Sequence, residues 1–248
     1  MHNYKLVIAY DGTNYSGWQI QPNGVSIQEL IQKALSICTR EDIKLIGSGR
    51  TDAGVHAQGQ VAHFLSSQEL LPNKILYSLN GMLPSDIRIK QMESIPNSFH
   101  AQYSTIGKIY HYNLWLDPVL DPTKRLYTHH VKGKFHLEDL IQAASLFLGT
   151  WDFTSFANEP HTGSAAKDPI RTLKRLDIVP QEGGVRLEFE GDGFLYKMVR
   201  NITGTLLEIA TAKRNLKEVP HIFAAKDRKQ AGLAAPAKGL FLMHVLYP

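Results

Sequence analysis

One aspartate stands among residues that suit catalysis. Asp52 lies in the stretch GRTDAGVH at 49–56, with Arg50 two positions before it and His56 four positions after it. A free aspartate titrates near pH ~4, so this carboxylate is ionised at neutral pH unless it is buried without a partner. Held in a glycine-rich loop beside an arginine, it could act as a nucleophile or a base. The same spacing fits an Asx-turn with a surface ion pair, and the loop alone leaves both interpretations open.

The elements that flank Asp52 are expected to be strands. The apolar residues Ile43, Leu45 and Ile46 precede the loop, and an apolar run at 61–65 follows it. Three glycines of the turn between the two runs, Gly47, Gly49 and Gly54, allow positive φ or the close approach of another group. The sequence therefore predicts a carboxylate presented on a tight connection between two strands.

The first part of the chain predicts the order β-α-β-β-α-β, which is the ferredoxin-like arrangement. Segment 26–39 predicts a helix because its apolar residues recur at three- and four-residue steps, with Ser26 as N-cap and Glu29 completing a capping box. The expected elements, in order, lie at 6–10, 26–39, 43–46, 61–65, 72–79 and 87–92.

The second part predicts a looser repeat of the same order. A long strand at 103–116 places Tyr110 on its apolar face, and the polar segment 158–168 predicts a surface loop. We therefore expect an α+β protein of two fused ferredoxin-like subdomains, 1–102 and 103–248, with mostly antiparallel sheets that meet at a central catalytic cleft. The expected elements of the second subdomain lie at 103–116, 137–148, 151–156, 173–179, 185–190, 197–210 and 240–246.

The composition indicates a globular protein with a mildly basic surface. The chain has 248 residues, 43% of them hydrophobic, and a formal net charge of +4, which gives modest support to a polyanionic partner. The N-terminus lacks a signal-like pattern, and no stretch approaches the ~20 apolar residues that span a bilayer. We therefore expect a cytoplasmic protein with no membrane partner.

The remaining chemistry-bearing residues predict neither a metal site nor a cofactor. Cys38 is the only cysteine, so no intrachain disulfide can form and a cysteine-pair zinc site is excluded. The histidines show no HxxxH pattern on a helix, and the chain has no GxxxxGK loop. The glycine spacing around Asp52 also differs from that of a dinucleotide-binding loop.

Several segments resemble the TruA family of tRNA pseudouridine synthases. The signature is GRTDAGVHA at 49–57, and YDGTNYSGWQIQ at 10–21 stands where the family has a similar segment. Nearly the whole chain is covered, because two further motifs and the C-terminal residues 240–248 also fit. Those two motifs are FHA at 99–101 with KIYHY at 108–112, and GFL at 193–195 with MVRN at 198–201.

The resemblance implies roles for four residues. Asp52 would be the catalytic nucleophile, and Arg200 would pair with it and keep it ionised. Tyr110 would stack on the target uracil and could act as a base, and Arg50 would help to hold that base out of the RNA. Without the resemblance, the default interpretation of Tyr110 is a core tyrosine, and the alternatives are a solvated helix arginine for Arg200 and a loop ion pair for Arg50.

The resemblance also implies an activity and a partner. The family isomerises uridine to pseudouridine at positions 38 to 40 of tRNA, without a cofactor and as a homodimer. Tyr15 and Trp18 in the first loop would then be available to stack on bases, although they could instead cap the core. Three alternatives remain: a pseudouridine synthase with another RNA target, a non-catalytic RNA-binding module, and a nucleotide-binding enzyme that uses the glycine loop on a phosphate.

Overall fold

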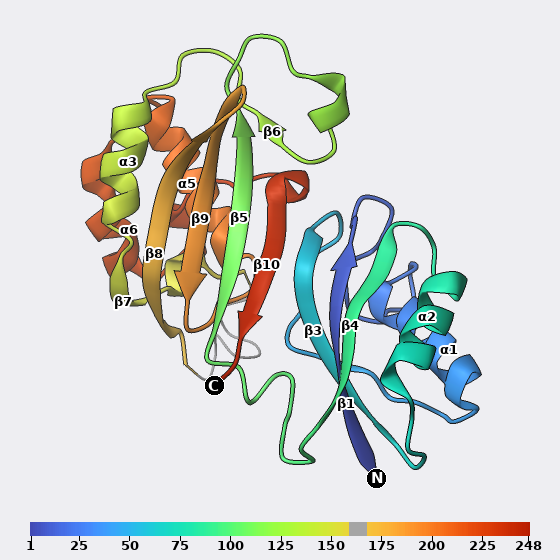
Figure 1. Cartoon of the computed structure of the whole chain (residues 1–248). Coiled ribbons are helices and arrows are strands. Elements are labelled where there is room, and N and C mark those ends of the chain that lie inside the picture. The colour runs from blue at the N-terminus through green and yellow to red at the C-terminus, as the bar shows by residue number, and fades with distance from the viewer. Residues whose placement is uncertain (159–167) are drawn as a thin grey trace. The chain divides into compact units, whose positions relative to one another are not determined.

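The chain forms two compact units of mixed α and β structure with mostly antiparallel strand pairing (Figure 1). The computed structural model describes residues 1–158 and 168–248. The first unit contains Met1–Ile106 together with Phe241–Pro248, and the second contains Gly107–Leu240. The predicted subdomains divided the chain between residues 102 and 103. The observed division differs because the last strand packs with the first unit.

The sheet of the first unit is built around its first strand. β1 (His2–Tyr10) pairs antiparallel with both β3 (His56–Ser66) and β4 (Ile87–Ile95). The far side of β3 pairs antiparallel with β2 and parallel with β10. The other elements of this unit are α1 (Ile27–Thr39), β2 (Ile46–Gly47), α2 (Pro72–Met82) and β10 (Leu240–Leu246).

Helix α1 begins where the sequence predicts. The side chain of Ser26 accepts a hydrogen bond from the Glu29 N–H at 3.4 Å, which satisfies one of the amides left open at a helix start. Ile27, Ile31 and Leu35 are fully buried along one face of the helix. This apolar stripe packs α1 into the core of the first unit.

The predicted strand at 43–46 is only partly formed. β2 covers two residues, although Ile43 and Leu45 are buried. Side chains of α1 bond this backbone in place of a neighbouring strand: Ser36 accepts from the Ile43 N–H at 3.2 Å, and Gln32 accepts from the Leu45 N–H at 3.1 Å. The segment is therefore fixed against the helix and not extended into the sheet.

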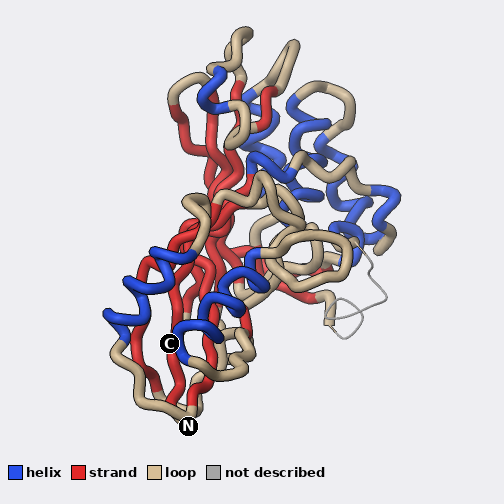
Figure 2. The backbone as a smooth tube through the Cα atoms, turned by 90° about the vertical axis from the view of Figure 1, so that its right-hand side faces the viewer, coloured by secondary structure: helices blue, strands red, loops and turns tan. Residues whose placement is uncertain are grey.

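The second unit is an antiparallel sheet in the order β5-β9-β8-β7. Its hairpin across Gly183 and Gly184 confirms the prediction from the alternating sequence. Figure 2 shows that its helices gather on one face of the sheet. The elements are β5 (Gly107–Trp115), β6 (His129–His130), α3 (Leu137–Ser145), β7 (Gly149–Asp152), β8 (Ile170–Gln181), β9 (Gly184–Gly191), α5 (Met198–Ala210) and α6 (Val219–Ala225), with single turns η1 (Pro122–Lys124), η2 (Thr154–Phe156), η3 (Leu216–Glu218), η4 (Arg228–Gln230) and η5 (Ala237–Gly239).

Helix α5 is the centre of the second unit. Ten of its residues are buried, including Ile202, Leu206 and Ile209, so it contacts neighbours on most sides. The surface loop predicted at 158–168 lies almost entirely outside the described residues. Across 1–158 and 168–248, the helices are too short or too polar to cross a membrane.

Candidate active site

The Asp52 loop is a tight turn in the first unit. The carbonyl of Asp52 accepts a hydrogen bond from the Val55 N–H at 3.1 Å, and Gly54 within this turn has a φ of +76°. Only glycine adopts that backbone conformation without strain. Asp52 itself is half-buried and Arg50 is exposed.

The first loop of the chain holds the Asp52 loop from one side. The N–H of Gly12 donates to Nδ1 of buried His56 at 3.1 Å, and the N–H of Trp18 donates to the Thr51 carbonyl at 3.1 Å. A β-carbon at Gly12 would lie 2.0 Å from the Val55 carbonyl oxygen, so the two backbones are in direct contact. The residues on both sides of Asp52 are therefore fixed by the segment that follows β1.

Buried side chains also hold the same loop through hydrogen bonds. The hydroxyls of Tyr10 and Thr51 are 2.7 Å apart, and burial raises the pKa of Tyr10, which keeps its phenol protonated. The buried amide of Gln60 accepts from the Ser48 hydroxyl at 2.8 Å and donates to the Gly49 carbonyl at 3.0 Å. Fully bonded buried groups of this kind are costly to disturb, so the loop has little freedom to change shape.

Tyr15 and Trp18 are buried and therefore not available to stack on bases. Trp18 is 1% exposed and Tyr15 is 8% exposed. The Tyr15 hydroxyl donates to a carboxylate oxygen of Asp86. The expectation that these rings contact RNA is therefore wrong, and they cap the core beneath the first loop, as the alternative interpretation predicted.

In the second unit, Tyr110 lies at the middle of β5. It pairs with Phe189 of β9 and is 7% exposed. The rings of Tyr110 and Phe194 lie nearly at a right angle to each other, with ring centroids 5.1 Å apart. This edge-to-face packing fixes the plane of the phenol.

Arg200, in the first turns of α5, is held by the segment that follows η4. Its Nε donates to the Ala235 carbonyl at 2.7 Å, and the Ala235 N–H donates back to the Arg200 carbonyl at 2.9 Å. The hydroxyl of Tyr112 donates to the next carbonyl, Pro236, at 2.8 Å. Burial raises the pKa of Tyr112, and the positive charge of Arg200 opposes that rise. Arg200 is thus brought beside the face of β5 that carries Tyr110. It is half-buried and hydrogen-bonded, unlike the exposed arginine expected on a solvated helix face.

A buried polar network lies one residue beyond Arg200. Asn201 is 0% exposed, and its amide donates to the Phe156 carbonyl at 2.7 Å and to Asn158 at 2.9 Å. Its oxygen accepts from Arg228 at 2.8 Å. The sequence predicted no role for Asn201 or Arg228, since the side-chain partners of Asn201 lie 27 to 45 residues from it in the chain. The one available signal was an asparagine within the predicted helix, where that residue type is disfavoured.

The four predicted site residues thus fall into two pairs. Asp52 and Arg50 belong to the first unit, whereas Tyr110 and Arg200 belong to the second. Among the described residues, no three His, Cys, Asp or Glu side chains are grouped to hold a metal ion.

A family model for tRNA pseudouridine synthase matches residues 6–104 and 143–248. The chain belongs to this family. The matched ranges contain the whole Asp52 loop and the Arg200 turn, whereas Tyr110 lies between them.

Three relatives extend the match along the chain. The tRNA pseudouridine synthase A 1 of Protochlamydia amoebophila is 62% identical over 248 residues, which cover 100% of this chain and 97% of the relative. The tRNA pseudouridine synthase A of Chlamydia muridarum is 46% identical over 98% of this chain and 91% of its own length. That of Acetivibrio thermocellus is 44% identical over 100% of both.

Proposed function

We propose that this chain isomerises uridine to pseudouridine in tRNA, at positions 38 to 40 of the anticodon stem-loop. The observation that carries the proposal is the Asp52 loop, which combines the family signature with a half-buried carboxylate on a fixed turn. The relatives are tRNA pseudouridine synthases by name, which supports tRNA as the substrate. The three positions come from the resemblance of the motifs.

The reaction needs few groups. The C1′–N1 bond breaks, the uracil turns, and C5 bonds to C1′. C5 loses a proton and N1 gains one, so nothing is oxidised or consumed and no cofactor is required. Asp52 starts the reaction, either by attack at C1′ or by removal of a ribose proton. The uridine must first leave its stack, at a cost of a few kcal/mol.

Three residues would assist Asp52 in this proposal. Arg200 pairs with Asp52 and keeps its carboxylate ionised, because a nearby positive charge lowers a carboxyl pKa. Tyr110 stacks on the uracil and could accept the C5 proton, which its fixed ring plane supports. Arg50 is exposed, which suits a residue that holds the extruded base out of the RNA.

The proposal includes the arrangement of the molecule. Two ferredoxin-like subdomains would meet at the catalytic cleft. In the first unit the strand order β4-β1-β3, with β2 antiparallel on β3, supports this architecture. The resemblance further implies a cytoplasmic homodimer, and light scattering during gel filtration would measure its mass as twice 27.8 kDa.

Tritium release from tRNA labelled at uridine C5 tests the activity directly. We expect wild-type protein to release tritium, and Asp52→Asn to reduce release at least about a thousandfold, because the amide is neither nucleophile nor base. Asp42→Asn is the matched control, since Asp42 is an exposed aspartate of the same unit.

The outcomes separate the alternatives. Loss of release in Asp52→Asn with tRNA binding retained supports the enzyme. If the wild-type protein releases no tritium, the result favours the alternative of a non-catalytic RNA-binding module. Release from uridines outside positions 38 to 40 would point to another RNA target.

A further inference from the structure

The connection between β5 and α3 carries a concentration of positive charge. Residues 117–136, which we call the basic arm, contain four lysines and arginines and only two acids, so the arm holds +2 of the chain's formal +4. It lies wholly within the stretch 105–142 that the family model leaves unmatched. The four cations are Lys124, Arg125, Lys132 and Lys134.

These cations are exposed and available to a partner. All four are exposed, and no ion pair in the described part of the chain joins a carboxylate to any of them; the second unit's ion pairs lie elsewhere, as at Arg175–Glu188. The carboxylate of Asp121 is occupied within the arm, where it accepts from the N–H and hydroxyl of Thr123 at 2.7 and 2.8 Å. The hydrogen bonds from Thr123 lower the pKa of Asp121, and Lys124 is near enough to contribute to that lowering, so only part of the arm's positive charge is neutralised internally.

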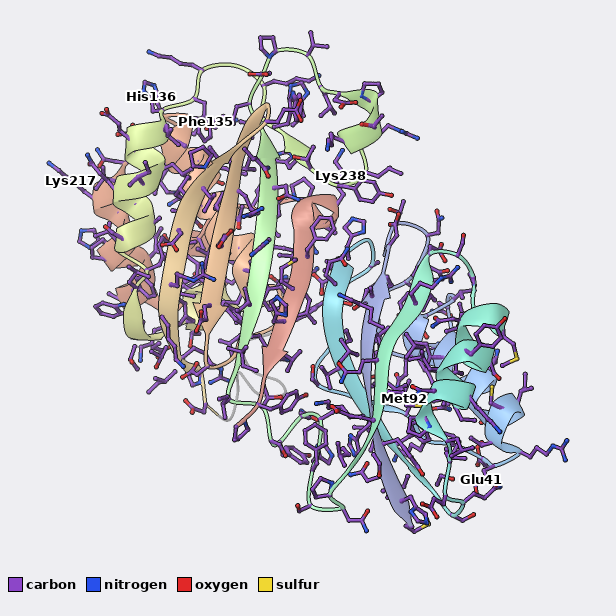
Figure 3. The ribbon with its side chains drawn as sticks, viewed as in Figure 1. Glu41, Met92, Phe135, His136, Lys217 and Lys238 are labelled. Carbon is purple, nitrogen blue, oxygen red and sulfur yellow. The ribbon has the colours of Figure 1, made fainter. Side chains whose placement is uncertain are left out.

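The arm is anchored to the sheet. β6 within it pairs in parallel with the end of β5, at Leu114 and Trp115. The Asn113 side chain donates to the Tyr127 carbonyl at 3.1 Å, and Lys238 donates to the Arg125 carbonyl at 2.9 Å. Lys238 lies at this end of the second unit in Figure 3 and adds a further positive charge. Anchored cations lose less conformational entropy on binding than a free tail would lose.

The position of the arm suggests which part of an RNA it would reach. Tyr110 and Trp115 are five residues apart on β5, and at ~3.3 Å per residue this places the start of the arm roughly 17 Å from the Tyr110 backbone. A single extruded nucleotide does not span that distance. The arm would therefore meet RNA several nucleotides away from the uridine.

We propose that the basic arm binds the phosphate backbone of tRNA outside the target loop and contributes affinity without contributing to the chemical step. This inference rests on the proposed function, because the substrate supplies the polyanion. Phosphates release counterions when lysine and arginine neutralise them, so this contact is sensitive to salt. Cations that touch only backbone strengthen binding about equally for all sequences.

Two double variants test the arm: Lys132→Ala with Lys134→Ala, and Lys124→Ala with Arg125→Ala. The control is Lys213→Ala with Lys217→Ala, which removes the same charge from exposed lysines of the same unit; Lys217 lies beside the helices in Figure 3. A fourth protein, Lys132→Arg with Lys134→Arg, keeps the charge. Filter binding to whole tRNA at several salt concentrations gives the affinity, and single-turnover tritium release gives the chemical rate.

We expect each arm variant to weaken tRNA binding about tenfold and to reduce the slope of log K against log salt by about 1.5, since two phosphate contacts are lost. The single-turnover rate at saturating tRNA should stay unchanged, and the arginine variant should bind like the wild-type protein. If the wild-type protein is active and the arm variants bind tRNA as tightly as the control variant does, the inference is overturned. An inactive wild-type protein would instead overturn the proposed function.

Discussion

Thr51 and Gln60 fix the Asp52 loop although neither carries a charge. Thr51 meets the Tyr10 hydroxyl, and Gln60 bonds Ser48 and Gly49. A nucleophile gains from such support because a shift of about 1 Å at a reacting atom can cost a hundredfold in rate. At the scale of residues, the shape of the Asp52 loop depends on these neutral hydrogen-bonding groups.

We expect His63 to make the stability of the fold depend on pH. It lies in β3, is 5% exposed, and its Nδ1 accepts from the Ala101 N–H at 3.1 Å. Burial, and then the nearby His100, lower the pKa of His63 to about 4. An unfolded histidine titrates near ~6.5, so between those values only the unfolded chain takes up the proton. We therefore expect the free energy of unfolding to fall as the pH drops from about 6.5 to about 4.

Urea unfolding at pH 7 and pH 5 measures this effect. His63→Gln should narrow the difference between the two pH values, whereas His244→Gln, a change at an exposed histidine of β10, should leave it as in the wild-type protein. An unchanged difference in His63→Gln would show that other groups cause the acid sensitivity.

At the scale of elements, the contact between α5 and the segment after η4 controls Arg200. A β-carbon at Gly204 would lie 1.6 Å from the Leu233 carbonyl oxygen, and this segment continues to Ala235, which bonds Arg200. Gly204→Ala should therefore destabilise the protein by about 1–3 kcal/mol, because the segment must move away, and should also reduce tritium release.

Gly81 near the end of α2 is the matched control. A β-carbon there meets no atom within 4 Å. Gly81→Ala should stabilise the protein by about 0.5–1 kcal/mol, since alanine favours the helix more than glycine does. Denaturant unfolding measures the change in the free energy of unfolding for both variants. Stabilisation by Gly204→Ala would contradict the close contact.

Much of this element structure could be predicted from local patterns. The stripe of α1, its Ser26 cap and the hairpin at Gly183 are set by neighbours in sequence, and all three were found. The segment 43–45 was predicted wrongly because side chains of α1 satisfy its backbone, which periodicity does not reveal. Local patterns also could not show that Tyr15 and Trp18 are buried, because their burial depends on which distant segments cover them.

The candidate site was also only partly predictable from the sequence. The motifs located Asp52, Tyr110 and Arg200, whose roles stay predictions. The supports of Arg200 were missed, because Ala235 is 35 residues away and Arg228 acts through Asn201. Such contacts depend on the packing of distant segments, so no regular spacing of residues in the sequence reveals them.

At the scale of the whole molecule, the two ends of the chain complete one unit. Phe241 stacks on His56 with ring centroids 4.5 Å apart, and the Tyr247 hydroxyl donates to the Ala101 carbonyl at 2.7 Å. His56 begins β3 and ends the Asp52 loop. The C-terminal strand therefore supports the strand that fixes this loop.

Truncation after Leu240 tests that support. We expect amide hydrogens in β3 to exchange at least about tenfold faster, while those of the β8–β9 hairpin exchange as before, because β10 pairs with β3 and with neither strand of that hairpin. Removal of Pro248 alone is the control. Unchanged exchange in β3 would mean that the first unit is stable without β10.

The return of the C-terminus to the first unit has a consequence for biosynthesis. A ribosome adds roughly 5–20 residues per second, so the nascent N-terminal part waits on the order of ten seconds while Gly107–Leu240 is made. During that time the β3 edge that β10 will cover has no strand at His56 and Ala57. Open edges of this kind attract other chains, so we expect the partly synthesised chain to be prone to association until β10 has been made and has paired with β3.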